Sequence, residues 1–414
     1  MLQGICSSSF SLQKAAQRRT ERWPAEGEIM MLPKSLVFGI VAVTILGWAG
    51  GVGLMLNVNS NAHADSGGDE KLGRGWRLGE AVTYENLTVF PVLASQQSDT
   101  SGFATLDDAL ASGSAVVTEQ GNYLRRTREG GGEAMPSGGA QVNQLVLVNR
   151  GKRPLLLLAG EIVSGGKQDR VIGKDRIVPP GAEPLPLSVF CVEHGRWTGG
   201  SDKFMAGGTM VHPSVREKAA VDQSQSQVWA AVRGAAGGSA GRSAVTAGAG
   251  TAAPRISQST VEAEIASGAP TMSYKQIYES PRVGKSVEEM AGQFERRFER
   301  ATKGQTVVGV VVAFGGEVAW SDIFASTPLF ETYWPKLLRS YAVEALSRPA
   351  SRENASLDDA RDFLKPANGR LREETEPGVY RWRERTEGQT AEIELEALDP
   401  KPVTLHWLKV LRAN

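Results

Sequence analysis

Charged side chains cluster around apolar, strand-like runs between Leu155 and Trp197. Glu161 ends one such run and Glu193 ends another, while Asp322 closes an apolar run much later in the chain. Two carboxylates that meet at one edge of a sheet can act as general acid and general base, or they can clamp a ligand. We therefore take Glu161, Glu193 and Asp322 as candidate catalytic residues.

Four further side chains in the same region suit ligand binding. Arg170 and Arg196 could supply positive charge beside the carboxylates, and guanidinium groups recognise anionic oxygens with well-defined geometry. Gln168 adds an amide, and Trp197 adds a large flat surface. The sequence thus predicts a polar site with Gln168, Arg170, Arg196 and Trp197 as its ligand-binding residues.

A structural explanation of these residues stays open. Glu161 could pair with Arg170, and Glu193 could pair with Arg196, so that each charge is neutralised by a close neighbour in the sequence. Asp322 could simply cap the loop that follows it. In that case the same residues would be internal ties of the fold.

Other reaction types find less support in the sequence. Cys191 lies among apolar residues, where a thiol behaves as a small hydrophobic group, and His194 falls on the opposite face of the same strand. Gly165, Gly166 and Lys167 could contact an anion through a turn, although this short pattern is common in ordinary turns. A cysteine nucleophile is therefore not expected.

The sequence predicts no metal site and no cofactor. The histidines that follow the N-terminal apolar segment are His194, His212 and His406, which are far apart in the sequence and form no metal-ligand spacing. The chain has 46 basic and 46 acidic residues, so no long-range field attracts nucleic acid. We expect a small-molecule ligand and no nucleic acid.

An apolar segment near the N-terminus predicts export. Lys34 precedes an uncharged apolar run that reaches Leu56, and Ala62-His63-Ala64 fits a signal cleavage site. The run is also almost long enough to span a bilayer, so a retained anchor is the alternative. We expect residues 1–64 to be an N-terminal extension plus a signal peptide or signal anchor. The remainder should be extracytoplasmic, in the periplasm or secreted, with membrane contact only through an uncleaved anchor.

Residue patterns predict an α+β fold of mostly antiparallel sheets with packed helices. We expect a strand-rich first half over residues 75–233 and a second half over residues 257–414 with helices, a hairpin and closing strands. A Gly/Ala/Ser-rich segment, residues 234–256, cannot bury enough apolar surface to order itself and separates the halves. Residues 142–149 and the strand after Pro154 should form a hairpin around Asn149–Lys152.

Helix patterns are clearest in the second half. Ser286 and Glu289 have the spacing of a capping box, which predicts a helix start there. A second helix should begin near Pro328, after a hairpin that turns at Gly315-Gly316. A further helix is expected after Pro213.

Three separated motifs resemble the ARG and rhodanese-phosphatase-superfamily-associated protein domain. They are the Gly-Glu stretch with the following Gln-x-Arg, the Cys-x-Glu-x-x-Arg-Trp stretch, and the Asp-x-Phe stretch with a later Trp-x-x-Leu helix. The matching positions here are Gly160, Glu161, Gln168, Arg170, Cys191, Glu193, Arg196, Trp197, Asp322, Phe324, Trp334 and Leu337. The resemblance extends over roughly residues 80–410.

This resemblance implies ligands of the ADP-ribose type or other phosphorylated compounds, by gene association alone. It implies no particular catalytic residue. We therefore hold two hypotheses: a small-ligand-binding or hydrolase-like module, and a non-catalytic interaction module of the cell envelope in which the polar residues are structural ties.

Overall fold

The computed structural model describes residues 74–119, 144–166, 168–192, 201, 203–232, 260, 274–348 and 354–412. The predicted N-terminal segment and the Gly/Ala-rich segment 234–256 lie outside these residues, so both stay predictions. Within the described ranges, no helix is both long enough and apolar enough to cross a membrane.

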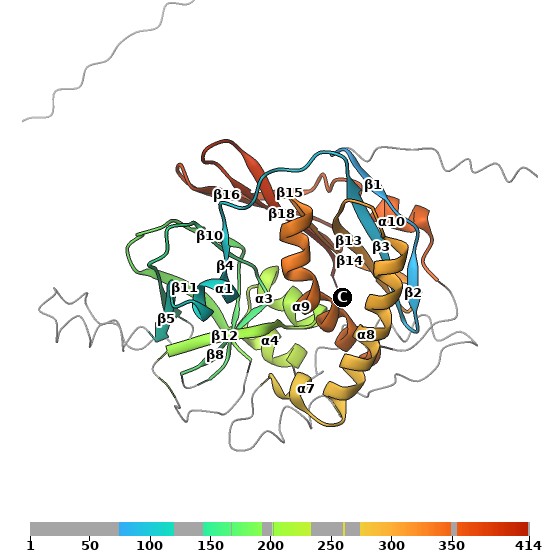
Figure 1. Ribbon diagram of the computed structural model, residues 1–414, viewed down its shortest axis with the longest axis horizontal. Helices are drawn as coiled ribbons and strands as arrows, with labels where there is room; N and C mark the ends of the chain where they lie inside the picture. The colour runs from blue at the N-terminus through green and yellow to red at the C-terminus, as the bar shows by residue number, and fades with distance from the viewer. Residues whose placement is uncertain are drawn as a thin grey trace, which may run out of the picture. The chain divides into compact units, whose positions relative to one another are not determined.

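A large antiparallel sheet takes strands from both ends of the described chain (Figure 1). Its order is β1-β3-β13-β14-β18-β17-β16-β15, and β2 also pairs with β3. The strands are β1 (Trp76–Leu78), β2 (Val82–Tyr84), β3 (Leu87–Ala94), β13 (Val307–Phe314), β14 (Glu317–Phe324), β15 (Arg370–Glu376), β16 (Tyr380–Glu387), β17 (Thr390–Ala397) and β18 (Val403–Leu411).

The centre of this sheet is the hairpin that the sequence predicts. Strand β13 is a nearly continuous run of valines, which favour extended backbone and pack well on a buried pleated surface. Gly315 and Gly316 join it to β14 with φ angles of 60° and 85°, a region that favours glycine. The predicted hairpin is confirmed.

Six antiparallel strands close into a small barrel, in the order β11-β6-β5-β12-β8-β9. These are β5 (Ala115–Glu119), β6 (Gln144–Asn149), β8 (Glu161–Gly165), β9 (Arg170–Ile172), β11 (Leu185–Cys191) and β12 (Lys203–Met210). Alternate residues of these strands, including Val117, Leu147, Val163, Ile172 and Val189, form one buried apolar cluster. That alternation is what a barrel with a packed interior requires.

A separate three-stranded sheet runs β10-β7-β4, with β4 (Ala104–Thr105), β7 (Leu155–Leu157) and β10 (Arg176–Val178). The predicted hairpin around Asn149–Lys152 is therefore wrong, because β6 belongs to the barrel and β7 to this sheet. The Asn149 side chain donates to the backbone carbonyls of Arg153 and Val178, at 3.0 Å each. These bonds fix the chain where it leaves one sheet for the other.

The helices are α1 (Leu106–Ala111), α3 (Pro213–Ala220), α4 (Gln225–Val232), α7 (Gln276–Glu279), α8 (Val283–Ala301), α9 (Thr327–Ser347) and α10 (Leu357–Phe363). Helix α8 begins three residues before the predicted capping box, so Ser286 lies inside it and bonds the Arg282 carbonyl instead. The helix predicted after Pro213 is divided into α3 and α4, with Gln223 at φ 48° between them.

Helices cover both faces of the central strands. Helices α8 and α9 lie against each other and bury Phe294, Phe298 and Leu337 against one face of the sheet. Helix α10 packs on the other face, where Ala360 joins a cluster with Trp407. Helices and separate antiparallel sheets confirm the predicted α+β class.

Candidate functional site

The turn from Leu158 to Glu161 connects β7 with β8 and carries the first predicted motif. The Leu158 amide donates to Oε2 of Glu161 at 2.7 Å, and the Ala159 amide donates to Oδ1 of Asp175 at 2.7 Å. The Ala159 carbonyl accepts a bond from Nε of Arg216, also at 2.7 Å. Backbone groups of one turn thus bind three charged side chains.

Gly160 in this turn has a steric reason to be glycine. Its φ angle is +98°, and an added Cβ atom would lie 2.7 Å from Cδ of Arg216. Non-bonded carbon atoms pack at about 3.5–4.0 Å, so any larger residue would displace the arginine. The Gly-Glu motif therefore allows Arg216 to pass close over the backbone.

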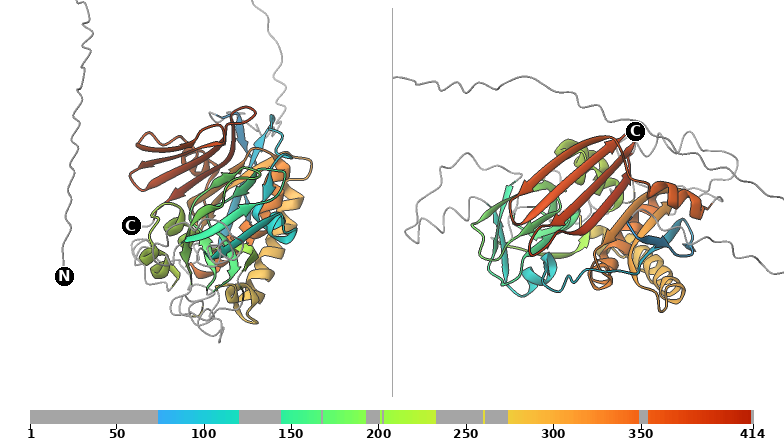
Figure 2. Two further views of the ribbon diagram at one scale, coloured as in Figure 1. Left: turned by 90° about the vertical axis from the view of Figure 1, so that its left-hand side faces the viewer. Right: turned by 90° about the horizontal axis from the view of Figure 1, so that it is seen from above.

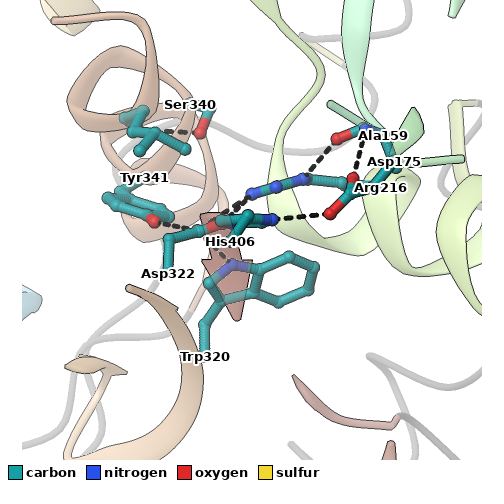
Figure 3. A network of polar contacts seen from close by, with 9 residues as sticks. Ala159, Asp175, Arg216, Trp320, Asp322, Ser340, Tyr341 and His406 are labelled. Atoms are coloured by element: carbon teal, nitrogen blue, oxygen red, sulfur yellow. Dashed lines mark hydrogen bonds and ion pairs between the residues drawn. The ribbon is translucent and has the colours of Figure 1, made fainter. Parts of the chain in front are cut away.

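Asp322 on β14 lies at the centre of a buried polar cluster (Figure 3). Its carboxylate is 2.8 Å from Nη1 of Arg216 and 2.9 Å from Nε2 of His406. Its Oδ2 atom also accepts bonds from the Trp320 indole, at 2.7 Å, and from the Tyr341 hydroxyl. We call Asp322, Arg216, His406, Asp175, Trp320 and Tyr341 the Asp322 cluster.

His406 on β18 lies between two carboxylates of this cluster. Nδ1 is 2.6 Å from Oδ2 of Asp175, and Nε2 is 2.9 Å from Oδ1 of Asp322. A neutral imidazole has one N–H, so two carboxylate neighbours favour the doubly protonated ring. Burial lowers the pKa of His406, but the charge and hydrogen bonds of Asp175 and Asp322 outweigh it and raise that pKa.

The side chains of the cluster are buried, and their formal charges cancel. Asp175, Arg216, Asp322 and His406 each expose 1% of their surface or less. Two carboxylates face one guanidinium and one imidazolium, so the formal charges cancel. Burial raises the pKa of Asp322, yet Arg216, His406 and Tyr341 together hold it well below its ordinary value. The predicted capping role of Asp322 is wrong, since three of its partners, Arg216, Tyr341 and His406, come from the distant elements α3, α9 and β18.

Glu161 belongs to a second group, the Lys336 cluster, which contains Lys336, Glu161 and Asp107. Nζ of Lys336 on α9 lies 2.5 Å from Oε1 of Glu161 and 2.9 Å from Oδ2 of Asp107. Burial lowers the pKa of Lys336, but these two carboxylates outweigh it and raise that pKa. Glu161 is therefore paired with Lys336, not with Arg170, so the predicted local pair is wrong.

Gln168 and Arg170 lie at one end of the barrel. Six strand ends meet there, as the strand register requires: Glu119, Gln144, Gly165, Arg170, Cys191 and Lys203. Arg170 is opposite Val163 and Cys191 in the register, so it shares their barrel-facing side. Gln168 and Arg170 are each only 2% exposed.

The environment of Arg170 differs from that of every other buried charge described above. Nη1 donates to Oε1 of Gln168 at 3.2 Å and to the Asp169 carbonyl at 3.3 Å, both uncharged oxygens. Among the residues that the structure describes, Nε has no hydrogen-bond partner and no carboxylate lies within 4.0 Å of the guanidinium. A buried cation without a counter-charge is costly and is a feature of ligand sites.

The glycines before Gln168 have a packing explanation. Gly165 and Gly166 have φ angles of 139° and 56°, and added Cβ atoms would lie 2.6 Å from the Lys203 carbonyl and 2.5 Å from the Phe204 ring. These glycines allow β8 to approach β12 closely. Their spacing is thus accounted for without a phosphate-binding turn.

Cys191 is a core residue, as its sequence neighbours predict. It is 1% exposed on β11, and the Gln225 side chain bonds its backbone amide and carbonyl at 2.8 Å each. In the described ranges no three His, Cys, Asp or Glu side chains group as metal ligands would.

The structure brings two of the predicted residues to one turn and leaves others untested. Glu161 lies in the Leu158–Glu161 turn, and Asp322 contacts a side chain that is bonded to this turn. Gln168 and Arg170 lie at the barrel end instead. Glu193, Arg196 and Trp197 lie outside the described residues.

Sequence reasoning missed Arg216, His406, Asp175 and Lys336. Arg216, Asp175 and Lys336 are charged residues that their local patterns explain adequately as surface or loop. Only His406 gave a signal, because it interrupts the apolar run of β18 at a position that should be buried.

Comparison with known proteins identifies the family. A sequence model of the ARG and Rhodanese-Phosphatase-superfamily-associated Protein domain matches residues 75–408. The chain belongs to this family. The match covers the large sheet, the barrel and both polar clusters, so the whole described architecture is that of the family domain. No curated protein and no solved structure matches the chain.

Proposed function

We propose that this domain binds a small anionic ligand, of the phosphorylated or ADP-ribose type, at the barrel end that carries Gln168 and Arg170. The observation that carries the proposal is the buried guanidinium of Arg170, whose hydrogen-bond acceptors among the described residues are uncharged oxygens. A phosphate oxygen would supply the missing counter-charge and accept a bond from Nε. The mouth of a small barrel is also a common place for ligands.

A hydrolase-like version of this proposal needs a carboxylate that can exchange a proton with the ligand. Both oxygens of Glu161 are engaged by Lys336 and the Leu158 amide, and Asp322 is fully enclosed. Glu193 follows β11 by two residues and is the remaining predicted candidate. Binding is therefore the primary proposal, and hydrolysis an extension that rests on Glu193.

Ligand screening of wild type and two arginine variants tests the proposal. Wild-type protein should gain thermal stability with ADP-ribose, nucleotides or phosphosugars, because a ligand that binds only the folded state stabilises it by mass action. Arg170→Gln should lose this gain. Arg176→Gln is the matched control, since Arg176 is paired with Glu376 on β15 and should leave ligand binding unchanged.

Two results would contradict ligand binding at Arg170. One is a wild-type melting temperature that none of these compounds changes. The other is an Arg170→Gln variant that binds with wild-type affinity in calorimetry, which would move any ligand to another place.

The alternative function is a non-catalytic interaction module of the cell envelope. It is favoured by the complete enclosure of Asp322 and Glu161, which makes those two family residues ties between elements. Glu161→Gln should then reduce stability without changing any ligand affinity. A loss of ligand binding at unchanged melting temperature would instead favour a direct role for Glu161.

Export is the second part of the proposal. The apolar run that ends at Leu56 and the Ala62-His63-Ala64 sequence support an extracytoplasmic location, with or without cleavage. Cell fractionation with an antibody against the domain tests it. A purely cytoplasmic protein that begins at residue 1 would contradict export.

A further inference from the structure

Strand β15 forms a free edge of the large sheet. Among the residues that the structure describes, it is the last strand in the sheet order and pairs only with β16, over all seven residues and without a register shift. Six of its seven residues are exposed. In Figure 2 the strands β15 to β18 are the red sheet, with β15 at its margin.

Most edge strands carry protection against pairing with another chain. Bulges, prolines and very short strands are common devices, and β15 has none of them. Its only protection is charge, in the sequence Arg-Leu-Arg-Glu-Glu-Thr-Glu. Charge discourages pairing with an apolar strand, but it permits pairing with a strand of complementary charge.

The charges of β15 complement a second copy of the same strand, in addition to the ion pairs that Glu374 and Glu376 make within the chain. An antiparallel pair centred on Glu373 places Arg370 opposite Glu376 and Arg372 opposite Glu374, each twice by symmetry. Moving the centre to Arg372 or Glu374 halves the number of Arg–Glu contacts. Leu371, which is 47% exposed and one of two exposed large apolar side chains among the described residues, would lie opposite Thr375.

We propose that a second copy of this chain pairs with β15 edge to edge, in the register centred on Glu373, and joins two large sheets into one. The twofold axis runs through the strand pair, so the interface is self-complementary. The contact is short and its charges are exposed, so the dimer is weak and sensitive to salt. The proposal is independent of the ligand site.

Glu373 is the one unfavourable position in this register. At the twofold axis it faces its own copy, and like charges directly opposite each other destabilise a strand pair. Glu373 has an ion-pair distance of 3.9 Å to Arg381, with both side chains largely solvated. Removing the charge of Glu373 should therefore change dimerisation more than it changes the stability of the fold.

Two substitutions of opposite expected effect test the proposal by sedimentation equilibrium of the purified full chain. Arg370→Glu turns two attractive contacts into repulsive ones and should weaken dimerisation about tenfold. Glu373→Thr removes the central repulsion and should strengthen it about threefold. Arg370 has no ion pair among the described residues, so the first change should leave the monomer intact.

Arg300→Glu is the matched control, because it makes the same charge change on the exposed end of α8. It should leave the dissociation constant unchanged, while added salt should weaken the wild-type dimer. A chain that stays monomeric at every concentration would overturn the proposal. So would association that neither β15 substitution alters, since the contact would then lie elsewhere.

Discussion

Two arginines of this domain are almost completely buried, and their surroundings differ. Arg216 exposes 1% of its surface and meets the carboxylate of Asp322, while its Nε binds the Ala159 carbonyl. Arg170 exposes 2% and meets only uncharged oxygens among its described neighbours. The two arginines are thus almost equally buried, but among their described neighbours only Arg216 meets a carboxylate.

The difference separates structural charge from charge that is suited to binding. A buried cation that is paired with a carboxylate holds its elements together, and removing one partner of such a pair lowers the stability of the fold. A buried guanidinium without a counter-ion reduces stability unless a ligand neutralises it. Family motifs contribute to both situations, Gly160 to the first and Arg170 to the second.

The strongest test of this comparison removes Arg216. Arg216→Ala leaves Asp322 and Asp175 facing only one cation, and breaking a buried pair in this way should lower the free energy of unfolding by about 3–5 kcal/mol. Urea denaturation measures the change. Arg339→Ala removes an exposed pair with Glu288 and should cost about 1 kcal/mol or less. Equal losses in both variants would refute the structural role of Arg216.

Two glycine-to-alanine variants isolate the contact between Arg216 and the Leu158–Glu161 turn. Gly160→Ala combines positive φ with a clash against Arg216 and should destabilise the fold by about 2–4 kcal/mol. Gly208→Ala has φ +60° but no atom within 4 Å of the added Cβ, so it should cost about 1 kcal/mol. Thermal and urea unfolding of both variants would measure how much of the lost stability comes from the clash with Arg216. A Gly160 variant no less stable than the Gly208 variant would contradict it.

The pH dependence of stability tests whether His406 is protonated in the Asp322 cluster. Its pKa is raised in the folded state, so its stabilising contribution is complete below the unfolded pKa and is lost as pH rises through the folded pKa. Wild-type stability should fall between the unfolded and the folded pKa of His406 by at most about 1.4 kcal/mol per pH unit. His406→Gln should lose this component of the slope, and identical slopes in both proteins would contradict a protonated His406.

Arg170 should give the smallest effect, with the opposite sign. Arg170→Met replaces a buried cation that has no carboxylate partner among the described residues with an apolar side chain of similar length, so ligand-free protein should be unchanged or gain about 1 kcal/mol. Chemical denaturation without ligand measures this effect. A loss as large as that of Arg216→Ala would show that Arg170 is a structural tie and would remove the basis of the proposed binding site.

Local patterns predicted those parts of the fold that depend on near neighbours. The β13–β14 hairpin follows from valines on either side of two adjacent glycines, and the apolar stripe of α8 follows from its helical spacing. The start of α8 was misplaced because Ser286 and Glu289 have a capping spacing, whereas the Ser280 hydroxyl accepts the bonds from the first amides of the helix. The Asn149 turn was misjudged because a short turn allows either a hairpin or a change of sheet.

Partners of the buried charges were beyond such patterns. Glu161 pairs with Lys336 across 175 positions, Asp322 with Arg216 across 106, and His406 with Asp175 across 231. The sequence favoured neighbours within ten residues, because nothing in a linear pattern indicates which distant cation the chain will bring close.

What the sequence by itself determined is the family, which three separated motifs indicate, and the α+β class, because periodicity is a property of neighbouring positions. Only the tertiary structure decided that Glu161 and Asp322 are paired and enclosed, while Arg170 has no carboxylate partner among the residues that the structure describes. The physical reason is that the cost of a buried charge depends on what lies within a few ångströms of it, and that is set by the path of the whole chain.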